Sequence, residues 1–293
     1  MIGDKPANEV VSFCLSKALD DLPAMPGIII RVLEETEKSE PSAATLEAII
    51  SADQAIASKV LRVVNSAYYG VQGRVSGIGQ AVVILGSQQV KNLVLSAAAM
   101  TAMQSTNSRH AEALRSFWVH SYATAAAAQL VAKLKNLSTV DSETVFVGGL
   151  LHDVGRLFMI THFPELFDEA LAKAQSAGGG LERFEREIFG VGHCEIGAAV
   201  AEKWSLPSQL IEVVRDHEGP LNEDSSVSVM VVHVADVMAK TMFGQDQALL
   251  SFDIDPLAQD WLNFGKDEYR SVRDEAVAKV EQASSVFGLL SAA

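Results

Sequence analysis

Residues 148–156 read Gly-Gly-Leu-Leu-His-Asp-Val-Gly-Arg, and they place a histidine beside an aspartate inside an otherwise apolar run. A carboxylate buried in apolar surroundings is costly unless a positive charge meets it. A divalent metal meets an adjacent imidazole and carboxylate equally well. We therefore expect His152 and Asp153 to bind a metal together with side chains from elsewhere in the chain.

The residues around this pair have helical spacing, and we expect one helix through the pair with Ser142 as its N-cap. Gly149, His152, Asp153 and Arg156 then share one face, and Gly149 leaves that face open. Arg156 lies one turn beyond the pair. There it either pairs with Asp153 or binds a ligand phosphate through two hydrogen bonds.

Helical periodicity runs through nearly the whole chain, without convincing strand patterns bounded by hairpin turns. The sequence therefore predicts an all-α fold. A long Ala-rich helix is expected at about residues 111–135, and the polar stretch at residues 104–109 is the best linker candidate. We expect an N-terminal helical subdomain at residues 1–108, packed on a metal-binding helical subdomain at residues 109–244, and a C-terminal helical appendage at residues 245–293.

Four further histidine and aspartate positions fall on apolar faces of predicted helices. His120 and His217 continue apolar stripes, Asp236 stands where an apolar residue is expected, and His193 opens a helix. Taken singly, such a residue is more often a hydrogen-bonded core side chain than a ligand. Taken with the His-Asp pair, they predict a metal site whose ligands are His120, His152, Asp153, His193, His217 and Asp236.

Imidazole and carboxylate ligands without a thiolate suit Fe, Mn, Zn or Mg, and the number of ligands allows one or two ions. The two cysteines, Cys14 and Cys194, lack metal-type spacing and are expected to be free thiols. His110 and His162 are expected at the surface or behind the ligands. His233 either ligates the metal or orients a ligand through a hydrogen bond.

The composition excludes several functional classes. The chain has 293 residues, 48% of them hydrophobic, which is enough for a large core. Its net charge of −14 and its lack of clustered Lys and Arg argue against nucleic acid as a partner. No uninterrupted apolar span or signal-peptide pattern is found, so we expect no membrane association and a cytoplasmic location. A phosphate or nucleotide ligand needs a local cation, which a metal supplies.

Two sets of residues resemble known families. The order His120, His152-Asp153, Asp236 on successive helices resembles the HD superfamily of metal-dependent phosphohydrolases. The N-terminal half resembles the HDOD domain, the HD-related output module of bacterial signalling proteins. Its most specific stretch is Asn65-Ser66-Ala67-Tyr68-Tyr69-Gly70. The other stretches that carry the resemblance are Leu22-Pro23-Ala24-Met25-Pro26, Ile49-Ile50-Ser51-Ala52-Asp53 and Ala81-Val82-Val83-Ile84-Leu85-Gly86.

The resemblance covers about residues 15–240 and implies an N-terminal helical subdomain packed on an HD-like bundle. His193 and His217 match additional ligand positions of metal-rich HD relatives, which include the cyclic-dinucleotide phosphodiesterases called HD-GYP. This chain departs from that subgroup. Glu218 is followed by Gly219-Pro220 and not by the Gly-Tyr-Pro signature. Asp216 stands where the subgroup has a histidine, and Arg156 stands where it has a lysine. These departures argue against cyclic-dinucleotide hydrolysis and leave other phosphoesters open.

The resemblance implies two alternative functions. In the first, the chain is a regulatory HDOD protein with a metal site that acts through a signalling partner or a phosphate or nucleotide ligand, and its acidic surface favours a basic partner. In the second, it is an active metal-dependent phosphohydrolase in which Asp153 bridges two ions and Arg156 stabilises charge, which makes these two the catalytic residues. We favour the first, because a ligand set predicts metal binding more directly than turnover.

Overall fold

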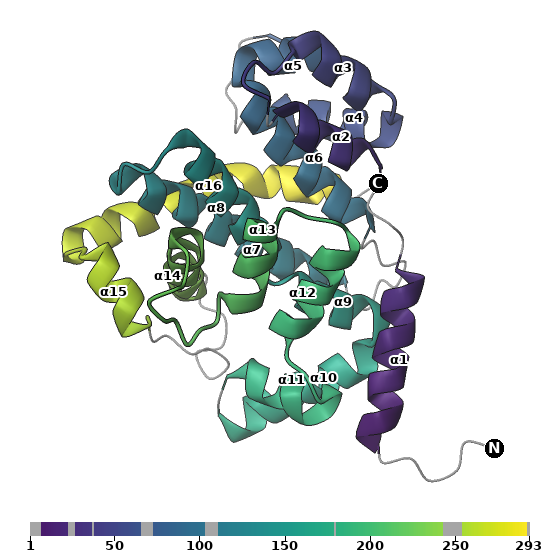
Figure 1. Cartoon of the computed structure of the whole chain (residues 1–293), viewed down its shortest axis with the longest axis vertical. Coiled ribbons are helices and arrows are strands. Elements are labelled where there is room, and N and C mark those ends of the chain that lie inside the picture. Colours follow the sequence, from purple (N-terminus) through teal and green to yellow (C-terminus); the bar gives the residue numbers. More distant parts are fainter. Residues whose placement is uncertain are drawn as a thin grey trace. The chain divides into compact units, whose positions relative to one another are not determined.

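The structure is a computed structural model that describes residues 7–22, 27–36, 38–65, 73–102, 111–178, 180–242 and 254–291. Every regular element in these residues is a helix, which confirms the all-α prediction (Figure 1). Some predicted features lie outside the described residues: they are the linker at 104–109, His110, and residues 23–26 and 66–70 of the stretches that resemble the HDOD domain.

The chain forms two compact units. The larger unit takes residues 1–23 and 105–274, and the smaller unit takes residues 24–104 and 275–293. The first helix therefore groups with the unit that carries the predicted ligands. The expected division of the chain into three parts stays a prediction.

Besides residues 275–293, the smaller unit consists of helices that bury aliphatic side chains against one another. They are α2 (Gly27–Thr36), α3 (Ala43–Ser51), α4 (Gln54–Val64), α5 (Ile78–Leu85) and α6 (Ser87–Ala102). Asn65 follows α4, and its side-chain amide donates to the carbonyl oxygens of Leu61 and Val75 at 2.8 Å each. Its oxygen accepts the Val75 amide at 2.7 Å. Asn65 thus joins the end of α4 to the segment that leads into α5.

The larger unit holds the other helices. They are α1 (Ala7–Asp21), α7 (Ala111–Leu134), α8 (Thr139–Leu151), α9 (Val154–His162), α10 (Pro164–Ala177), α11 (Leu181–Phe189), α12 (His193–Lys203), α13 (Ser208–Asp216), α14 (Val227–Met242), α15 (Pro256–Leu262) and the first part of α16 (Lys266–Ser291). Helices α7, α8 and α14 pack on one another, while α12 packs on α9 and α13. The predicted Ala-rich helix is confirmed as α7.

Glycines allow two pairs of helices to approach closely. A Cβ atom on Gly155 of α9 would lie 1.9 Å from the carbonyl oxygen of His193, so α9 meets α12 backbone to backbone. A Cβ atom on Gly149 of α8 would lie 2.8 Å from the backbone of Ala125 in α7. The expectation that Gly149 leaves an open face is therefore wrong, because the Ala125 backbone fills that space.

The prediction of one helix through the His-Asp pair is wrong. His152 and Asp153 form a turn between α8 and α9, with Asp153 at φ −93° and ψ 18°. The His152 ring donates from Nδ1 to the Gly149 carbonyl oxygen at 2.7 Å, and a continuing helix would bond that oxygen to the amide of residue 153. Ser142 is not the N-cap, because α8 begins at Thr139. The pair is therefore presented by a helix junction.

One apolar stretch of the described residues, Thr144–His162, is long enough to cross a membrane by length and composition alone. Its most apolar window is 83% buried inside the protein. Burial of this extent is that of a core element and is consistent with a soluble protein.

Candidate metal centre

The larger unit brings all six predicted ligands together. Five of them are at most 2% exposed, and only His120 is partly accessible. The ligands come from separate elements: His120 from α7, His152 and Asp153 from the α8–α9 junction, His193 from the start of α12, His217 from the end of α13, and Asp236 from α14. A centre assembled from five places in the sequence is held by the packing of the whole unit.

Asp153 lies between two groups of imidazoles. Its Oδ1 is 3.2 Å from His193 Nε2 and 3.6 Å from His217 Nε2. Its Oδ2 is 3.5 Å from His152 Nε2 and 3.8 Å from His120 Nε2. One carboxylate oxygen thus faces each group. We name His120, His152 and Asp236 the outer half of the centre, and His193 and His217 the inner half.

Hydrogen bonds at Nδ1 determine which ring nitrogen can bind a cation. His152 and His217 each donate from Nδ1 to the carbonyl oxygen three residues earlier, at 2.7 Å and 3.0 Å. His193 Nδ1 lies 2.6 Å from the Glu185 carboxylate. Because these oxygens accept hydrogen bonds, Nδ1 carries the proton in all three rings. Each Nε2 therefore faces the centre, where it can bind a cation after losing any proton of its own.

Two kinds of contact in the centre call for a cation. His120 Nε2 and His152 Nε2 are 3.3 Å apart, and His193 Nε2 and His217 Nε2 are 3.4 Å apart, so at most one proton fits between each pair. Asp236 Oδ1 is buried, lies 3.0 Å from His120 Nε2, and makes no hydrogen bond. Buried polar atoms are nearly always satisfied. A divalent metal would satisfy these atoms, so the residues fit such an ion.

Arg156 pairs with Asp153, which is one of the two roles expected for it. Its Nη1 donates to Asp153 Oδ1 at 3.0 Å and to Oδ2 at 2.8 Å, and its Nε donates to Glu185 at 2.8 Å. Burial raises the pKa of Asp153, but Arg156 and the nearby histidines outweigh it and hold that pKa well below its usual value. Asp153 therefore stays ionised in a buried position.

Lys240 and Glu218 reach the outer half, although neither was a predicted site residue. Lys240 Nζ is 2.7 Å from Asp236 Oδ2 and 3.2 Å from Glu218 Oε1. Burial raises the pKa of Asp236, but the Lys240 charge outweighs it and lowers that pKa well below its usual value. Both positions had a sequence signal, because Lys240 lies one helical turn after Asp236 and Glu218 directly follows His217.

The charges of this network leave an excess of negative charge. Within the described residues it joins four carboxylates to two permanent cations: Asp153, Glu185, Glu218 and Asp236 against Arg156 and Lys240. Protonated histidines or a divalent metal can balance the remaining charge.

Glu185 on α11 anchors the inner half, and sequence reasoning missed it. Its Oε2 lies 2.6 Å from His193 Nδ1 and accepts the His193 amide at 3.3 Å. Burial raises the pKa of Glu185, but Arg156 and His193 lower it to about 2. Burial and Arg156 lower the pKa of His193, yet Glu185, Cys194 and Asp153 raise it further, to about 10. A metal must therefore displace a proton from His193.

The signal for Glu185 was its position on an apolar stripe. Leu181, Ile188 and Phe189 lie one turn away from it on the same helix face. A carboxylate in that place requires a buried partner, as Asp236 does.

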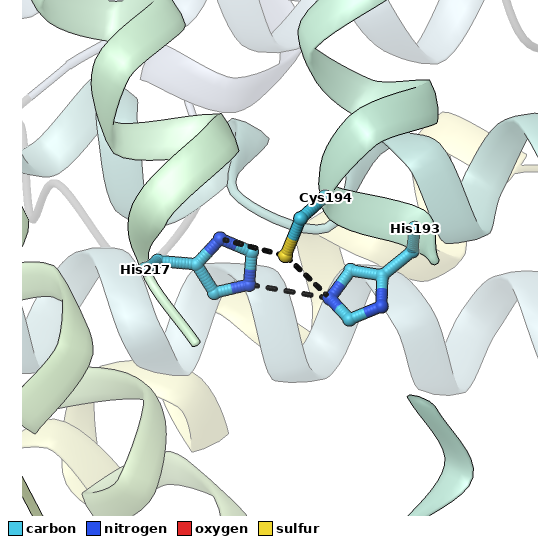
Figure 2. Close-up of side chains that lie close together, drawn as sticks. All are labelled: His193, Cys194 and His217. Carbon is cyan, nitrogen blue, oxygen red and sulfur yellow. Dashed lines mark hydrogen bonds between the residues drawn. The ribbon is translucent and has the colours of Figure 1, made fainter. Parts of the chain in front are cut away.

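Cys194 lies with the inner half, as Figure 2 shows. The thiol is buried, and its Sγ is 3.4 Å from His193 Nε2 and 4.0 Å from His217 Nδ1. Burial raises the pKa of this thiol, but the two imidazoles outweigh it and lower the pKa from 9.0 to about 6. Both cysteines are free, as expected, but Cys194 lies beside two of the predicted metal ligands.

A pocket of about 240 Å³ leads to the outer half. Its polar wall is formed by His120, Asp153, Arg156, Glu218 and Lys240. Its apolar wall is formed by Phe117, Ile160, Phe167, Leu171 and Leu181. His193 and His217 do not line it, so a ligand in this pocket reaches the outer half first.

The other described histidines do not face the centre. His233 donates from Nδ1 to the His217 carbonyl oxygen at 2.7 Å and accepts the Asp255 amide at Nε2 at 2.9 Å. With both nitrogens bonded, His233 orients the segment that carries His217 and does not ligate a metal. His162 is exposed and stacks on Phe158, with ring centroids 4.3 Å apart.

The sequence pattern of the HDOD domain matches residues 22–220. A curated relative, an uncharacterized protein of Treponema pallidum (strain Nichols), is 28% identical over 203 residues. These residues cover 69% of this chain and 39% of that protein, so the alignment spans about two fifths of the relative.

Three solved structures share the fold. A Shewanella amazonensis protein described as a phosphohydrolase superposes with a TM-score of 0.71 at 23% identity, covering 94% of this chain and 97% of that one. An HDOD domain protein of Geobacter sulfurreducens gives 0.68 at 22% identity, covering 96% and 97%. A Marinobacter aquaeolei protein described as a signal transduction protein gives 0.76 at 18% identity, covering 98% and 67%. Since the family pattern matches more than half of the sequence, this chain belongs to the HDOD domain family.

Proposed function

We propose that this chain is a cytoplasmic bacterial signal-transduction protein whose larger unit binds one or two divalent metal ions and, with them, a phosphate or nucleotide ligand. Ligand binding is passed on to a signalling partner, and the net charge of −14 favours a partner with a basic surface. One observation carries the proposal: the Nε2 atoms of two groups of imidazoles converge on the two oxygens of Asp153.

Each half of the centre would hold one ion, and Asp153 would serve both. The outer ion would be held by His120, His152, Asp153 and Asp236, and the inner ion by Asp153, His193 and His217. A divalent metal supplies Lewis acidity toward a phosphoryl oxygen. Imidazole and carboxylate ligands suit Fe, Mn, Zn or Mg.

The pocket supports a ligand that has an anionic part and an apolar part. Its polar wall contains Arg156 and Lys240, and its apolar wall offers aromatic and aliphatic side chains to a base or a similar group. Both cations already pair with carboxylates. A phosphate therefore needs the additional charge of a metal, and we expect it to bind only to the metal-loaded protein.

Metal analysis of the purified protein tests this proposal. Wild-type protein reconstituted with Mn or Zn should retain one or two ions per chain. Asp153→Ala should retain none, because the same carboxylate serves both halves. His162→Ala is the matched control, since this imidazole is exposed and lies outside the centre. Near-zero occupancy in both wild type and Asp153→Ala would contradict the proposal.

A second candidate function is metal-dependent hydrolysis of a phosphoester. The pocket favours it, because His120 and Asp153 line the space that a substrate would occupy. A Shewanella amazonensis protein of the same fold is described as a phosphohydrolase. In this function Asp153 joins the two halves, and Arg156 stabilises charge that develops on the phosphoryl group.

A screen of nucleotides and generic phosphoesters with added Mn or Fe separates the two functions. Turnover that disappears in His152→Ala would establish hydrolysis. Metal-dependent binding of inorganic phosphate without turnover of any phosphoester would support the regulatory function.

A further inference from the structure

We propose that Cys194 supplies a thiolate ligand to the inner half, so that this half prefers Zn, Fe or another thiophilic metal over Mg and Mn. The inference rests on the metal binding proposed above and assigns a donor that this proposal does not include. It also predicts that the two halves of one centre differ in metal preference.

The distances around His193 support this assignment. Zinc with bonds of about 2.0–2.1 Å to nitrogen and about 2.3 Å to sulfur separates the ligand atoms of a tetrahedron by about 3.3–3.6 Å. His193 Nε2 lies 3.4 Å from His217 Nε2, 3.4 Å from Cys194 Sγ and 3.2 Å from Asp153 Oδ1. These three distances from His193 Nε2 match those between ligands of one ion, and His217 Nε2 lies 3.6 Å from Asp153 Oδ1. The ligand atoms of His193, Cys194 and His217 all lie within 4.8 Å of one another (Figure 2).

The imidazoles point to an ion at this place independently of the cysteine. His193 and His217 hold their Nδ1 protons against Glu185 and a backbone carbonyl oxygen, so both Nε2 atoms face the same space. Two lone pairs 3.4 Å apart repel each other unless a proton or a metal ion lies between them. The thiol therefore lies beside a position that already requires positive charge.

The surroundings of Cys194 differ from those of a structural cysteine. A structural thiol packs among apolar side chains. This Sγ instead has the ring nitrogens of His193 and His217 as polar neighbours at 3.4 Å and 4.0 Å. In the outer half the described ligands offer nitrogen and oxygen atoms only. Soft sulfur ligands select Zn and Fe, whereas oxygen ligands also suit Mg and Mn.

Cobalt substitution tests the assignment directly. Co(II) bound to a thiolate gives a sulfur-to-metal charge-transfer band in the near ultraviolet, and Co(II) bound only to nitrogen and oxygen does not. The full-length wild-type protein loaded with two Co(II) ions should show this band. Cys194→Ala and the nearly isosteric Cys194→Ser should lose it. Cys14→Ala is the matched control, because Cys14 is exposed, and it should keep the band.

Metal titration gives a second readout. Mutation of a group that only hydrogen-bonds a metal ligand lowers metal affinity by about 10–100-fold. Loss of a direct ligand should therefore weaken Zn binding at one of the two sites by about 100-fold. Mn binding at the outer half should not change. Circular dichroism should show that Cys194→Ser keeps its helices.

The outcomes separate this inference from the proposal on which it rests. If wild type binds two Co(II) ions without a charge-transfer band, or if Cys194→Ser keeps the band, the thiolate ligand is wrong while the metal centre stands. If wild type binds no metal at all, both are wrong.

Discussion

The inner and outer halves of the centre share Asp153, and His217 also lies near His152 and Asp236, but the two halves differ in exposure and in the groups around them. The inner half is closed: His193 and His217 are 0% exposed, and a buried carboxylate and a thiol lie against them. The outer half contacts a pocket through His120, and Lys240 holds its Asp236. For the proposed metal binding, this difference predicts that the inner half retains its cation and that the outer half exposes its cation to a ligand.

The difference arises from the helices that supply the ligands. The inner ligands lie at the ends of α12 and α13, which pack on each other, and α12 also packs on α9. The outer ligands come from α7, the α8–α9 junction and α14, and residues of α7, α9, α10, α11 and α14 line the pocket. The same carboxylate therefore lies in two environments, and each can be changed separately.

Chelation should have the largest effect on the protein. A ligand present at about 1,000 times its Kd stabilises the folded state by about 4 kcal/mol. At about 2–4 °C per kcal/mol, its removal should lower the Tm by about 10 °C. Differential scanning calorimetry before and after chelation measures this change. Zn should restore the full Tm, whereas Mg should restore only the part due to the outer half. If Zn and Mg restore the Tm equally, the two halves do not differ in metal preference.

Gly155→Ala should disrupt the support of the inner half. Its Cβ atom would lie 1.9 Å from the His193 carbonyl oxygen and would force α9 away from α12. We expect a loss of about 3 kcal/mol of unfolding free energy, as in other overpacked contacts. Urea unfolding measures it, and Zn retention should fall more than Mn retention. Gly180→Ala is the control, because nothing lies within 4 Å of its added Cβ atom.

The stability of the metal-free protein should depend on pH through the inner half. The pKa of His193 is raised from 6.5 to about 10. Its contribution to the free energy of unfolding is therefore complete below pH 6.5 and is lost as the pH rises through 10. The pKa of Glu185 is lowered from 4.5 to about 2, so its contribution is complete above pH 4.5 and is lost as the pH falls through 2.

Thermal unfolding across the pH range checks this dependence. The metal-free protein should be most stable between about pH 4.5 and pH 6.5, where both contributions are complete. With Zn bound, the loss of stability on the alkaline side should disappear, because the metal replaces the proton on His193. If the protein loses the same stability at alkaline pH with and without Zn, the metal does not bind His193.

Glu185→Gln should weaken only the inner half. The carboxylate orients His193 and raises its basicity, and loss of such a group lowers metal affinity by about 10–100-fold. Competition titration with a chromophoric chelator measures the two affinities separately. Glu187→Gln is the matched control, since Glu187 lies on the same helix, is exposed and pairs with Lys173. A variant in which both affinities fall equally would show that the halves are not independent.

Lys240→Met should have the smallest effect and should change only the outer half. Loss of one charge-assisted hydrogen bond is worth about 1.5 kcal/mol, so binding of inorganic phosphate to the metal-loaded protein should weaken about 10-fold. Isothermal titration calorimetry measures this change, with the exposed Lys133→Met as control. Unchanged phosphate affinity would mean that Lys240 serves only to hold Asp236.

The fold class and the ligands were predictable because their signals are local. A period of 3.6 residues needs no knowledge of distant contacts, and a charged residue on an apolar face, such as Asp236, shows that it needs a partner. The same test applied to Glu185 would have found it, because this residue also interrupts an apolar stripe. The break at His152 was not predictable, because the local pattern is continuous and a hydrogen bond to Gly149 ends the helix there.

The sequence alone determined that this protein is helical and which six imidazole and carboxylate side chains would lie together. Only the tertiary structure decided how they are divided: which oxygen of Asp153 faces each group, and which histidine is bonded at both nitrogens. It also decided that a thiol joins one group and a lysine the other. The physical reason is distance, because metal ligation and desolvation act over a few ångströms between residues that may be a hundred positions apart in the chain.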